Sequence, residues 1–225
     1  MRIDVLTLFP ELIDRVCGES IIGRARKAGV LTVEAHNIRD YSDDRRRRVD
    51  DTPYGGGMGM LMAAPPVCAC YDSVLKLADL PKTKTIYLSP KGRVLTQRYA
   101  SYLASQDRLI LLCGHYEGID ERILEETGAE EISIGDYVLT GGELAACVLI
   151  DCVGRLVDGV LSSEECHEIE SIAAGMLEYP QYTRPEVFRG RAVPRVLLEG
   201  NHEEVRKWRY AEAVKQTKKK RPDLF

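Results

Sequence analysis

Long apolar runs are missing from this sequence. No stretch approaches the roughly 20 residues that a helix needs to cross a bilayer, and the first residues carry no signal-peptide pattern. We therefore expect a protein that is neither embedded in a membrane nor exported, and we place it in the cytoplasm. Hydrophobic residues make up 44% and charged residues 29% of the chain, which excludes global disorder and predicts a packed core.

Metal and nucleotide signatures are missing as well. The seven cysteines are scattered and the four histidines lie far apart, so the sequence itself predicts no metal site. An odd number of cysteines without a secretion signal predicts reduced thiols. The motif G-x-x-x-x-G-K-[ST] does not occur, and no G-x-G-x-x-G follows the first predicted strand. Both absences disfavour a P-loop NTPase and a dinucleotide-binding domain of the usual type.

Apolar runs that predict strands alternate with stretches of helical periodicity. This alternation is typical of an α/β protein with a mostly parallel sheet and helices on both faces. The predicted strands span residues 3–8, 31–35, 85–88, 108–113 and 131–134. The predicted helices span residues 10–28, 64–77, 96–105, 120–127 and 143–152, with a further one at 202–218.

Charge divides the chain into parts. Residues 181–225 contain twelve Lys or Arg against six Asp or Glu, although the whole chain has a net charge of −4. Residues 161–180 contain five glutamates and no Lys or Arg, which is the composition of a linker. We predict a catalytic domain at 1–160, an acidic linker at 161–176 and a small basic helical domain at 177–225. The basic part suggests a polyanionic partner, and a solvated helical face would explain its charge equally well.

Three glycine-bearing segments follow the last three predicted strands. They are YLSPKGR at 87–93, CGHYEGID at 113–120 and IGDYVLTGGE at 134–143. Ligands of open α/β sheets bind beyond the carboxyl ends of the strands, and glycine allows a ligand to approach the backbone closely. We therefore predict one pocket built from these segments. A fourth segment, DTPYGGGMGM at 51–60, is either a flexible turn or a lid or interface loop in which the methionines offer apolar cover.

These segments, together with DVLTLFPE near the start and LEYPQYTRPEVFRG after the linker, resemble the bacterial tRNA (guanine-N1)-methyltransferases of the SPOUT superfamily. The resemblance extends over almost the whole chain. It implies a trefoil knot made by the three segments, with S-adenosylmethionine bound inside it, and a homodimer whose active sites are built from both subunits. The methyl group would go to N1 of the guanine 3′ of the anticodon, position 37, when the preceding base is also guanine. The resemblance also implies Mg²⁺ as a second cofactor.

The resemblance assigns site residues to this sequence. The methyl acceptor must lose a proton, and the family uses an aspartate as the base and an arginine to stabilise charge on O6. The arginine corresponds to Arg155. The aspartate position holds Glu170, a carboxylate that can act as the same base, and Glu168 is its nearest rival. The implied cofactor residues are Tyr87, Leu88, Ser89, Pro90, Gly114, Tyr116, Glu117, Ile134, Gly135, Asp136, Tyr137, Val138, Leu139, Gly141 and Gly142.

The tRNA is expected to contact the basic C-terminal part through phosphate-binding side chains. The candidates are Arg184, Arg189, Arg195, Asn201, His202, Arg206 and Arg209. Trp208 lies on the predicted apolar stripe of the last helix, so we expect it to pack in a core rather than stack on a base. The arginine run at 45–48 is flanked by aspartates, so it either forms local ion pairs or contacts the anticodon stem.

Two alternatives stay open on the sequence alone. One is another RNA methyltransferase of the same superfamily, acting on rRNA or on a ribose hydroxyl. The other is an RNA-binding protein that keeps the fold without catalysis, which the glutamate in place of aspartate would favour.

Overall fold

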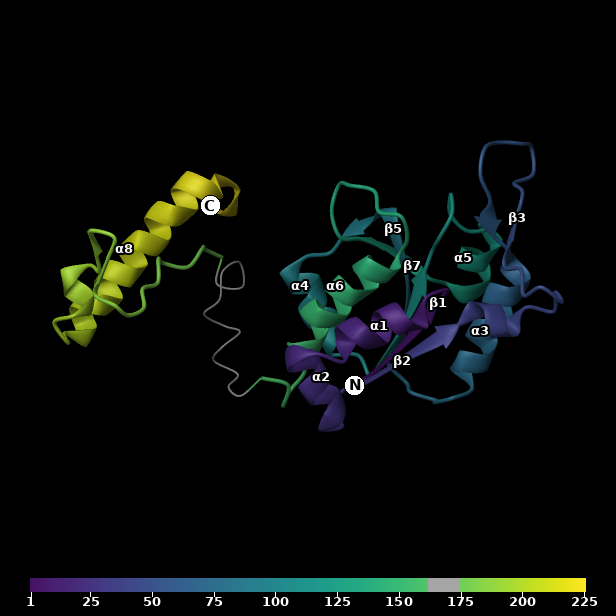
Figure 1. The fold of residues 1–225 in the computed structure, drawn as a ribbon, viewed down its shortest axis with the longest axis horizontal. Coiled ribbons are helices and arrows are strands. Elements are labelled where there is room, and N and C mark those ends of the chain that lie inside the picture. The colour runs from purple at the N-terminus through teal and green to yellow at the C-terminus, as the bar shows by residue number, and fades with distance from the viewer. Residues whose placement is uncertain (162–174) are drawn as a thin grey trace. The chain divides into compact units, whose positions relative to one another are not determined.

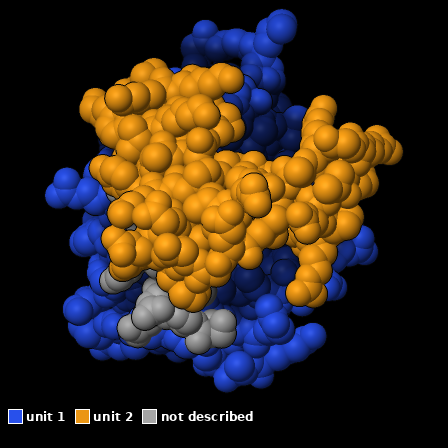
Figure 2. Space-filling model, turned by 90° about the vertical axis from the view of Figure 1, so that its left-hand side faces the viewer, with its two compact units in different colours: residues 1–162 blue, residues 163–225 orange. Residues whose placement is uncertain are grey.

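The chain forms two compact units in the computed structural model, which describes residues 1–161 and 175–225. The units are Met1–Ser162 and Ser163–Phe225 (Figure 2). Cys166, Glu168 and Glu170 lie outside the described residues, as does most of the predicted linker. Each unit is therefore treated by itself.

The first unit is built on a five-stranded sheet in which every pairing is parallel (Figure 1). The strand order is β2-β1-β6-β5-β7, so the three strands that precede the glycine-bearing segments are neighbours. The predicted α/β fold with a parallel sheet is confirmed. The strands are β1 (Arg2–Thr7), β2 (Thr32–Asn37), β5 (Thr83–Val94), β6 (Arg108–Cys113) and β7 (Glu130–Ser133).

The central strand β6 is buried along its whole length and separates two hydrophobic cores. Leu109 and Leu111 point into one core, and Ile110 and Leu112 point into the other, because side chains alternate along a strand. The first core lies against α1 (Pro10–Cys17), α2 (Ser20–Lys27), α4 (Gln97–Ala104) and α6 (Glu143–Gly154). The second core lies against the 3₁₀ helix η1 (Ile38–Tyr41), α3 (Ala64–Leu75) and α5 (Arg122–Thr127). Helices therefore cover both faces, as predicted.

The single helix predicted over residues 10–28 is wrong. Helix α1 ends at Gly18, and the chain turns through Ser20, which has a left-handed conformation with φ of 53°. A Cβ atom on Gly23 would stand 2.1 Å from the carbonyl oxygen of Gly18. The absence of a side chain at Gly23 thus lets α2 pack tightly against the end of α1, a contact that periodicity does not reveal.

The sequence places the segment 87–93 after the end of a strand, and this placement is wrong. Strand β5 runs through these residues, with a bulge between Leu88 and Arg93. Leu88 and Arg93 both pair with Ile132 of β7, so the chain bulges between them and then rejoins the sheet. Gly92 permits this return, since a Cβ there would stand 2.3 Å from the backbone of Glu131.

Two of the helices have boundaries set by local chemistry. The Thr96 hydroxyl accepts a hydrogen bond from the Tyr99 amide at 3.2 Å and caps α4. Gly128 ends α5 with φ of 60°. No helix within residues 1–161 and 175–225 combines the length and the apolar character that a membrane span requires.

The second unit consists of a long helix and a short hairpin. Helix α8 (His202–Lys220) begins at Asn201, whose side-chain oxygen accepts from the amides of Glu203 and Glu204. The hairpin, which the sequence did not predict, pairs β8 (Val187–Phe188) with β9 (Arg191–Ala192). Short 3₁₀ helices complete the unit at Arg195–Leu197 and Pro222–Leu224.

Candidate active site

A pocket lies at the carboxyl ends of β5, β6 and β7, where the three glycine-bearing segments meet. It encloses about 670 Å³ of space free of protein atoms, a volume that includes the part open to solvent. Fourteen of the fifteen predicted cofactor residues line it, and Asp136 does not. The structure thus brings together segments that are separated by more than 40 positions in the sequence.

The first wall of the pocket comes from β5. Tyr87 is almost fully buried, and burial, followed by the charges of Glu131 and Glu121, raises the pKa of its phenol to about 12. The phenol therefore stays neutral at physiological pH. A Cβ on Gly114 would stand 2.7 Å from the Tyr87 hydroxyl oxygen, so the second segment must have glycine at this place.

The second wall has a strained backbone. Tyr116 adopts a left-handed conformation with φ of 59°, which residues with side chains rarely adopt and which tends to occur at functional sites. The Glu117 amide donates to the carbonyl oxygen of Met60 at 3.1 Å, and Gly59 packs against the Glu117 side chain. The segment 51–60 therefore contacts the rim of the pocket.

The methionines of segment 51–60 suggest an apolar cover over the pocket, and the structure shows this only in part. It joins the short strands β3 (Asp50–Asp51) and β4 (Leu61–Met62). Met62 is buried in the second core, whereas Met58 and Tyr54 are almost fully exposed. The glycines at 55, 56, 57 and 59 all have positive φ, which the turn requires.

The third wall is held against the second by backbone contacts. The Gly142 amide donates to the Gly114 carbonyl oxygen at 2.8 Å, and a Cβ on Gly142 would stand 2.8 Å from Cys113 Cα. The Ser133 hydroxyl accepts from the Gly135 amide at 3.1 Å and fixes the start of the turn. The apolar side chains of Val138 and Leu139 are exposed next to the pocket.

His115 lines the pocket, and the sequence reasoning did not single it out. Its ring makes edge contacts with Phe9 and Tyr116, at centroid distances of 5.2 Å and 5.0 Å. Its Nδ1 atom is buried and has no hydrogen-bond partner among the described residues. Such an atom is destabilising by about 1–3 kcal/mol unless a partner is supplied. The sequence feature that could have pointed to His115 is its position inside CGHYEGID, between two predicted cofactor residues, Gly114 and Tyr116.

Arg155 does not line this pocket. It follows α6, whose 12 residues span about 18 Å. The pocket includes Gly141, Gly142 and Ala145, at the other end of the helix. The arginine and the pocket of the same chain therefore lie at opposite ends of α6, while Glu170 and Glu168 fall outside the described residues.

The seven predicted tRNA-binding residues are all exposed. Arg184, His202 and Arg209 line a groove of the second unit, which also includes Tyr179 and Tyr182. The Arg209 guanidinium stacks over the Tyr179 ring at 4.8 Å. Cations beside aromatic rings suit phosphates and unpaired bases.

Several neighbouring predictions have structural outcomes. Asn201 caps α8, so its side-chain oxygen already serves the helix, and Arg195 pairs with Glu199 at 3.5 Å. Arg189 and Arg206 are exposed on the same unit. Trp208 is half-buried against Tyr179 and Tyr182, which agrees with packing rather than with an open stacking surface.

The arginine run at 45–48 forms local ion pairs. Arg47 pairs with Asp40 at 2.9 Å and Arg48 pairs with Asp44 at 3.1 Å. All four side chains lie at or near the surface, so these pairs stabilise little. Local ion pairing thus accounts for the charges of at least two of the four arginines, Arg47 and Arg48.

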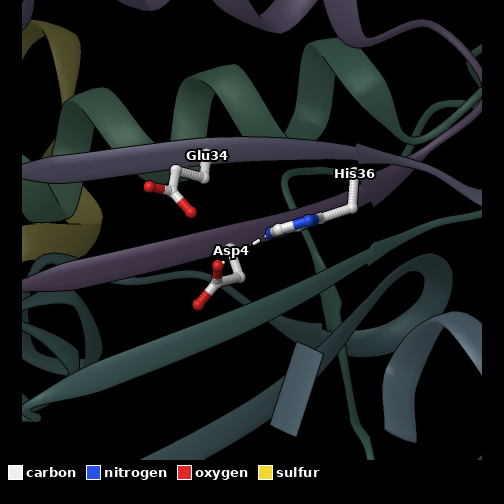
Figure 3. Close-up of side chains that lie close together, drawn as sticks. All are labelled: Asp4, Glu34 and His36. Atoms are coloured by element: carbon white, nitrogen blue, oxygen red, sulfur yellow. Dashed lines mark hydrogen bonds and ion pairs between the residues drawn. The ribbon is translucent and has the colours of Figure 1, made fainter. Parts of the chain in front are cut away.

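Asp4, Glu34 and His36 form a cluster on β1 and β2 whose donor atoms lie within 4.8 Å of one another (Figure 3). Asp4 is fully buried and accepts from Arg2, Arg108 and His36, each at 2.7–2.8 Å. Two guanidinium groups on one carboxylate would repel a divalent cation, so this cluster does not fit Mg²⁺. It is an ion-pair network inside the sheet.

The cysteines of the described residues are free thiols, as the sequence predicts. Burial raises the pKa of Cys70 to about 12, and it also raises the pKa of Cys113 well above its ordinary value. These two thiols therefore stay protonated and act as small apolar core residues.

A parallel α/β sheet with a pocket at the carboxyl ends of three adjacent strands defines a ligand-binding protein of a kind common among enzymes. The sequence model of the tRNA (Guanine-1)-methyltransferase TrmD family matches residues 1–225. The chain belongs to this family, which confirms the resemblance read from the sequence.

Relatives of high identity carry the family name. The tRNA (guanine-N(1)-)-methyltransferase of Ruminiclostridium cellulolyticum is 59% identical over 225 residues, covering 100% of this chain and 96% of the relative. The tRNA (guanine-N(1)-)-methyltransferase of Lachnospira eligens is 53% identical over 225 residues, covering 100% of this chain and 95% of the relative. The similarity therefore includes both compact units.

Proposed function

We propose that this protein methylates N1 of guanine 37 in tRNA, when guanine precedes it, with S-adenosylmethionine as the methyl donor. The observation that carries the proposal is the pocket where three segments of the family's characteristic sequence converge at the carboxyl ends of adjacent strands. The names of the relatives support guanine N1 of tRNA as the target.

The residues of the pocket fit a nucleoside. Apolar side chains such as Leu88, Ile134 and Leu139 can cover the faces of an adenine ring, and the backbone groups around Gly114 and Gly142 can meet its polar edge. When bound, S-adenosylmethionine supplies a methyl group already activated by its sulfonium. The protein holds the acceptor in line with that group and excludes water, which lowers the barrier by several kcal/mol.

Two charged side chains serve the acceptor. Glu170 removes the proton from guanine N1, and a base positioned in this way contributes about 10²–10⁴-fold to the rate. Negative charge then moves to O6, where the Arg155 guanidinium stabilises it. The shift of one methylene between aspartate and glutamate keeps the same acid–base chemistry.

We further propose a homodimer with shared active sites. Within one chain, Arg155 and the pocket are separated by the length of α6, so a second subunit is needed to bring an Arg155 to the pocket. Leu144 and Val148 are one turn apart on α6, and both are about half-exposed, as is Val16 on the neighbouring α1. Apolar side chains exposed together on packed helices are typical of an interface.

The second unit binds the tRNA in this proposal. Arg184 and Arg209 offer cations along one groove, which His202 also lines, and residues 181–225 carry twice as many Lys and Arg as Asp and Glu. Phosphate contacts of this type weaken as the salt concentration rises. The trefoil knot and a role for Mg²⁺ stay predictions of the resemblance, and the cytoplasmic location stays a prediction of the sequence.

The test is transfer of labelled methyl groups from S-adenosylmethionine to unmodified tRNA transcripts. A transcript with guanines at positions 36 and 37 should become labelled at N1 of guanine 37, and a matched transcript with adenine at position 37 should not. Label on a ribose or on rRNA would favour another methyltransferase of the superfamily. Tight tRNA binding without any transfer would favour a non-catalytic RNA-binding protein.

A further inference from the structure

His115 is a polar residue of the pocket for which the proposed reaction gives no role. It sits between the rings of Phe9 and Tyr116, an apolar slot that a phenylalanine would fill equally well. Yet it brings a buried Nδ1 atom that has no partner among residues 1–161 and 175–225. Buried polar atoms are almost always hydrogen-bonded, so an exception in a ligand pocket calls for a functional explanation.

A buried carboxylate lies close to this nitrogen. Glu143, the first residue of α6, is only 4% exposed. The Phe9 amide donates to the Thr7 hydroxyl at 2.9 Å, and that hydroxyl donates its proton to Glu143 Oε1 at 2.8 Å. The direction of this chain makes Glu143 Oε1 an acceptor.

Gly141 shows how near the two groups are. A Cβ on Gly141 would stand 2.5 Å from Glu143 Oε2 and 2.8 Å from His115 Nδ1. Both atoms thus border the place that a Cβ on residue 141 would occupy, and the glycine leaves this place open.

We propose that Thr7, Glu143 and His115 form a relay that recognises the amino-acid end of the bound cofactor. His115 donates Nδ1–H to Glu143 Oε2, a carboxylate oxygen that accepts it. In the neutral ring, Nε2 is then the acceptor, and it can meet a ligand because His115 lines the pocket. The ligand must therefore offer a hydrogen-bond donor, either an N–H or an O–H group.

The cofactor carries such a group in its ammonium. The negative charge of Glu143 behind the ring favours a cationic ligand group that donates to Nε2. In other active sites, a carboxylate hydrogen-bonded to a histidine likewise stabilises a positive charge on that ring. This inference rests on the proposed function, since it concerns the same cofactor. His115 is a ligand-binding residue in it, and Glu143 and Thr7 are positioning residues.

Calorimetry with two nucleosides tests the relay. S-adenosylhomocysteine has the amino-acid end, and 5′-methylthioadenosine lacks it. We expect His115→Phe, which keeps the ring contacts, to weaken S-adenosylhomocysteine about tenfold or more while leaving 5′-methylthioadenosine unchanged. His115→Gln, whose amide can accept near the position of Nε2, should keep most of the affinity.

The outcomes separate the two proposals. Loss of affinity for both nucleosides in His115→Phe, or for neither, would overturn the relay. If the unaltered protein binds neither nucleoside, the cofactor assignment itself falls, and the relay with it.

Nitrogen NMR of histidine gives an independent readout. The chain has four histidines, so the His115 signals can be assigned by their loss in His115→Phe. In the unaltered protein, at a pH of about 8 where imidazole is neutral, Nδ1 should carry the proton. In Glu143→Gln the amide donates to Nδ1, so the proton should move to Nε2 and the affinity for S-adenosylhomocysteine should fall. The same protonated nitrogen in both proteins would overturn the relay.

Discussion

Replacing Asp4 by asparagine should destabilise the first unit strongly. Asp4 and Arg108 are both fully buried, and their carboxylate and guanidinium meet at 2.8 Å. The substitution keeps the shape of the side chain and removes its charge. Arg108 then keeps its hydrogen bonds to the carbonyl oxygens of Val74 and Ala78 but loses its buried counter-ion.

The expected magnitude follows from two estimates. Leaving one member of a buried ion pair without its partner costs about 3–5 kcal/mol. Burial on its own raises the pKa of Asp4, but hydrogen bonds from His36 and Arg2 and the charge of Arg108 lower it from 3.8 to about 2. A shift of this size corresponds to about 2 kcal/mol. Because the carbonyl contacts of Arg108 persist, we expect a loss of roughly 3 kcal/mol near neutral pH.

The same pKa shift fixes the pH dependence. A carboxylate whose pKa is lowered by folding stabilises the protein fully above its unfolded value of 3.8, and this stabilisation disappears as the pH falls through about 2. The Asp4→Asn protein lacks this contribution at every pH. The difference between the two proteins should therefore shrink between pH 4 and pH 2.

Urea unfolding measures the effect. Far-UV circular dichroism follows the helices of both units, whereas emission from Trp208, the single tryptophan, reports on the second unit and serves as an internal control. The matched variant is Glu34→Gln, because Glu34 also contacts Arg2 but is 49% exposed, so it should change the stability by less than about 1 kcal/mol. If Asp4→Asn is no less stable than Glu34→Gln, the ion-pair reasoning is wrong.

Three further predictions concern the proposed reaction. Glu170→Gln should bind S-adenosylhomocysteine and tRNA normally but lose most of its turnover in single-turnover assays, whereas the control Glu168→Gln should keep it. Loss of turnover in Glu168→Gln but not in Glu170→Gln would make Glu168 the base. Arg155→Ala should slow turnover by about 10²-fold or more. Gly114→Ala should lose cofactor affinity, because the added Cβ would stand 2.7 Å from the Tyr87 hydroxyl oxygen. Mixing the Arg155→Ala and Gly114→Ala proteins should restore activity if the sites are shared, because a mixed dimer has one site with an intact pocket and an intact arginine. A mixture no more active than its components would contradict shared sites. Arg184→Ala should reduce the slope of tRNA affinity against salt by about one ion, and an unchanged slope would remove Arg184 from the phosphate contacts.

The elements that the sequence predicted well are those governed by local chemistry. Strand β6 was predicted with its observed bounds, because a continuous apolar run is what a strand buried on both faces needs. The cap at Thr96 and the terminal glycine at 128 are also local, since each acts within one turn of its own helix. The contact of Gly23 with Gly18 was missed because α2 alone has acceptable helical periodicity.

The sequence by itself determined the α/β class and the edge at which the pocket forms, because parallel strands place the segments that follow them at one end of a sheet. Family resemblance added the residues of that pocket, and fourteen of them line it. Only the tertiary structure decided the hydrogen bond of Thr7 to Glu143 and the pairing of Asp4 with Arg108. These partners are 136 and 104 positions apart, so no local pattern relates them, and only the packing of the strands and of α6 brings them together.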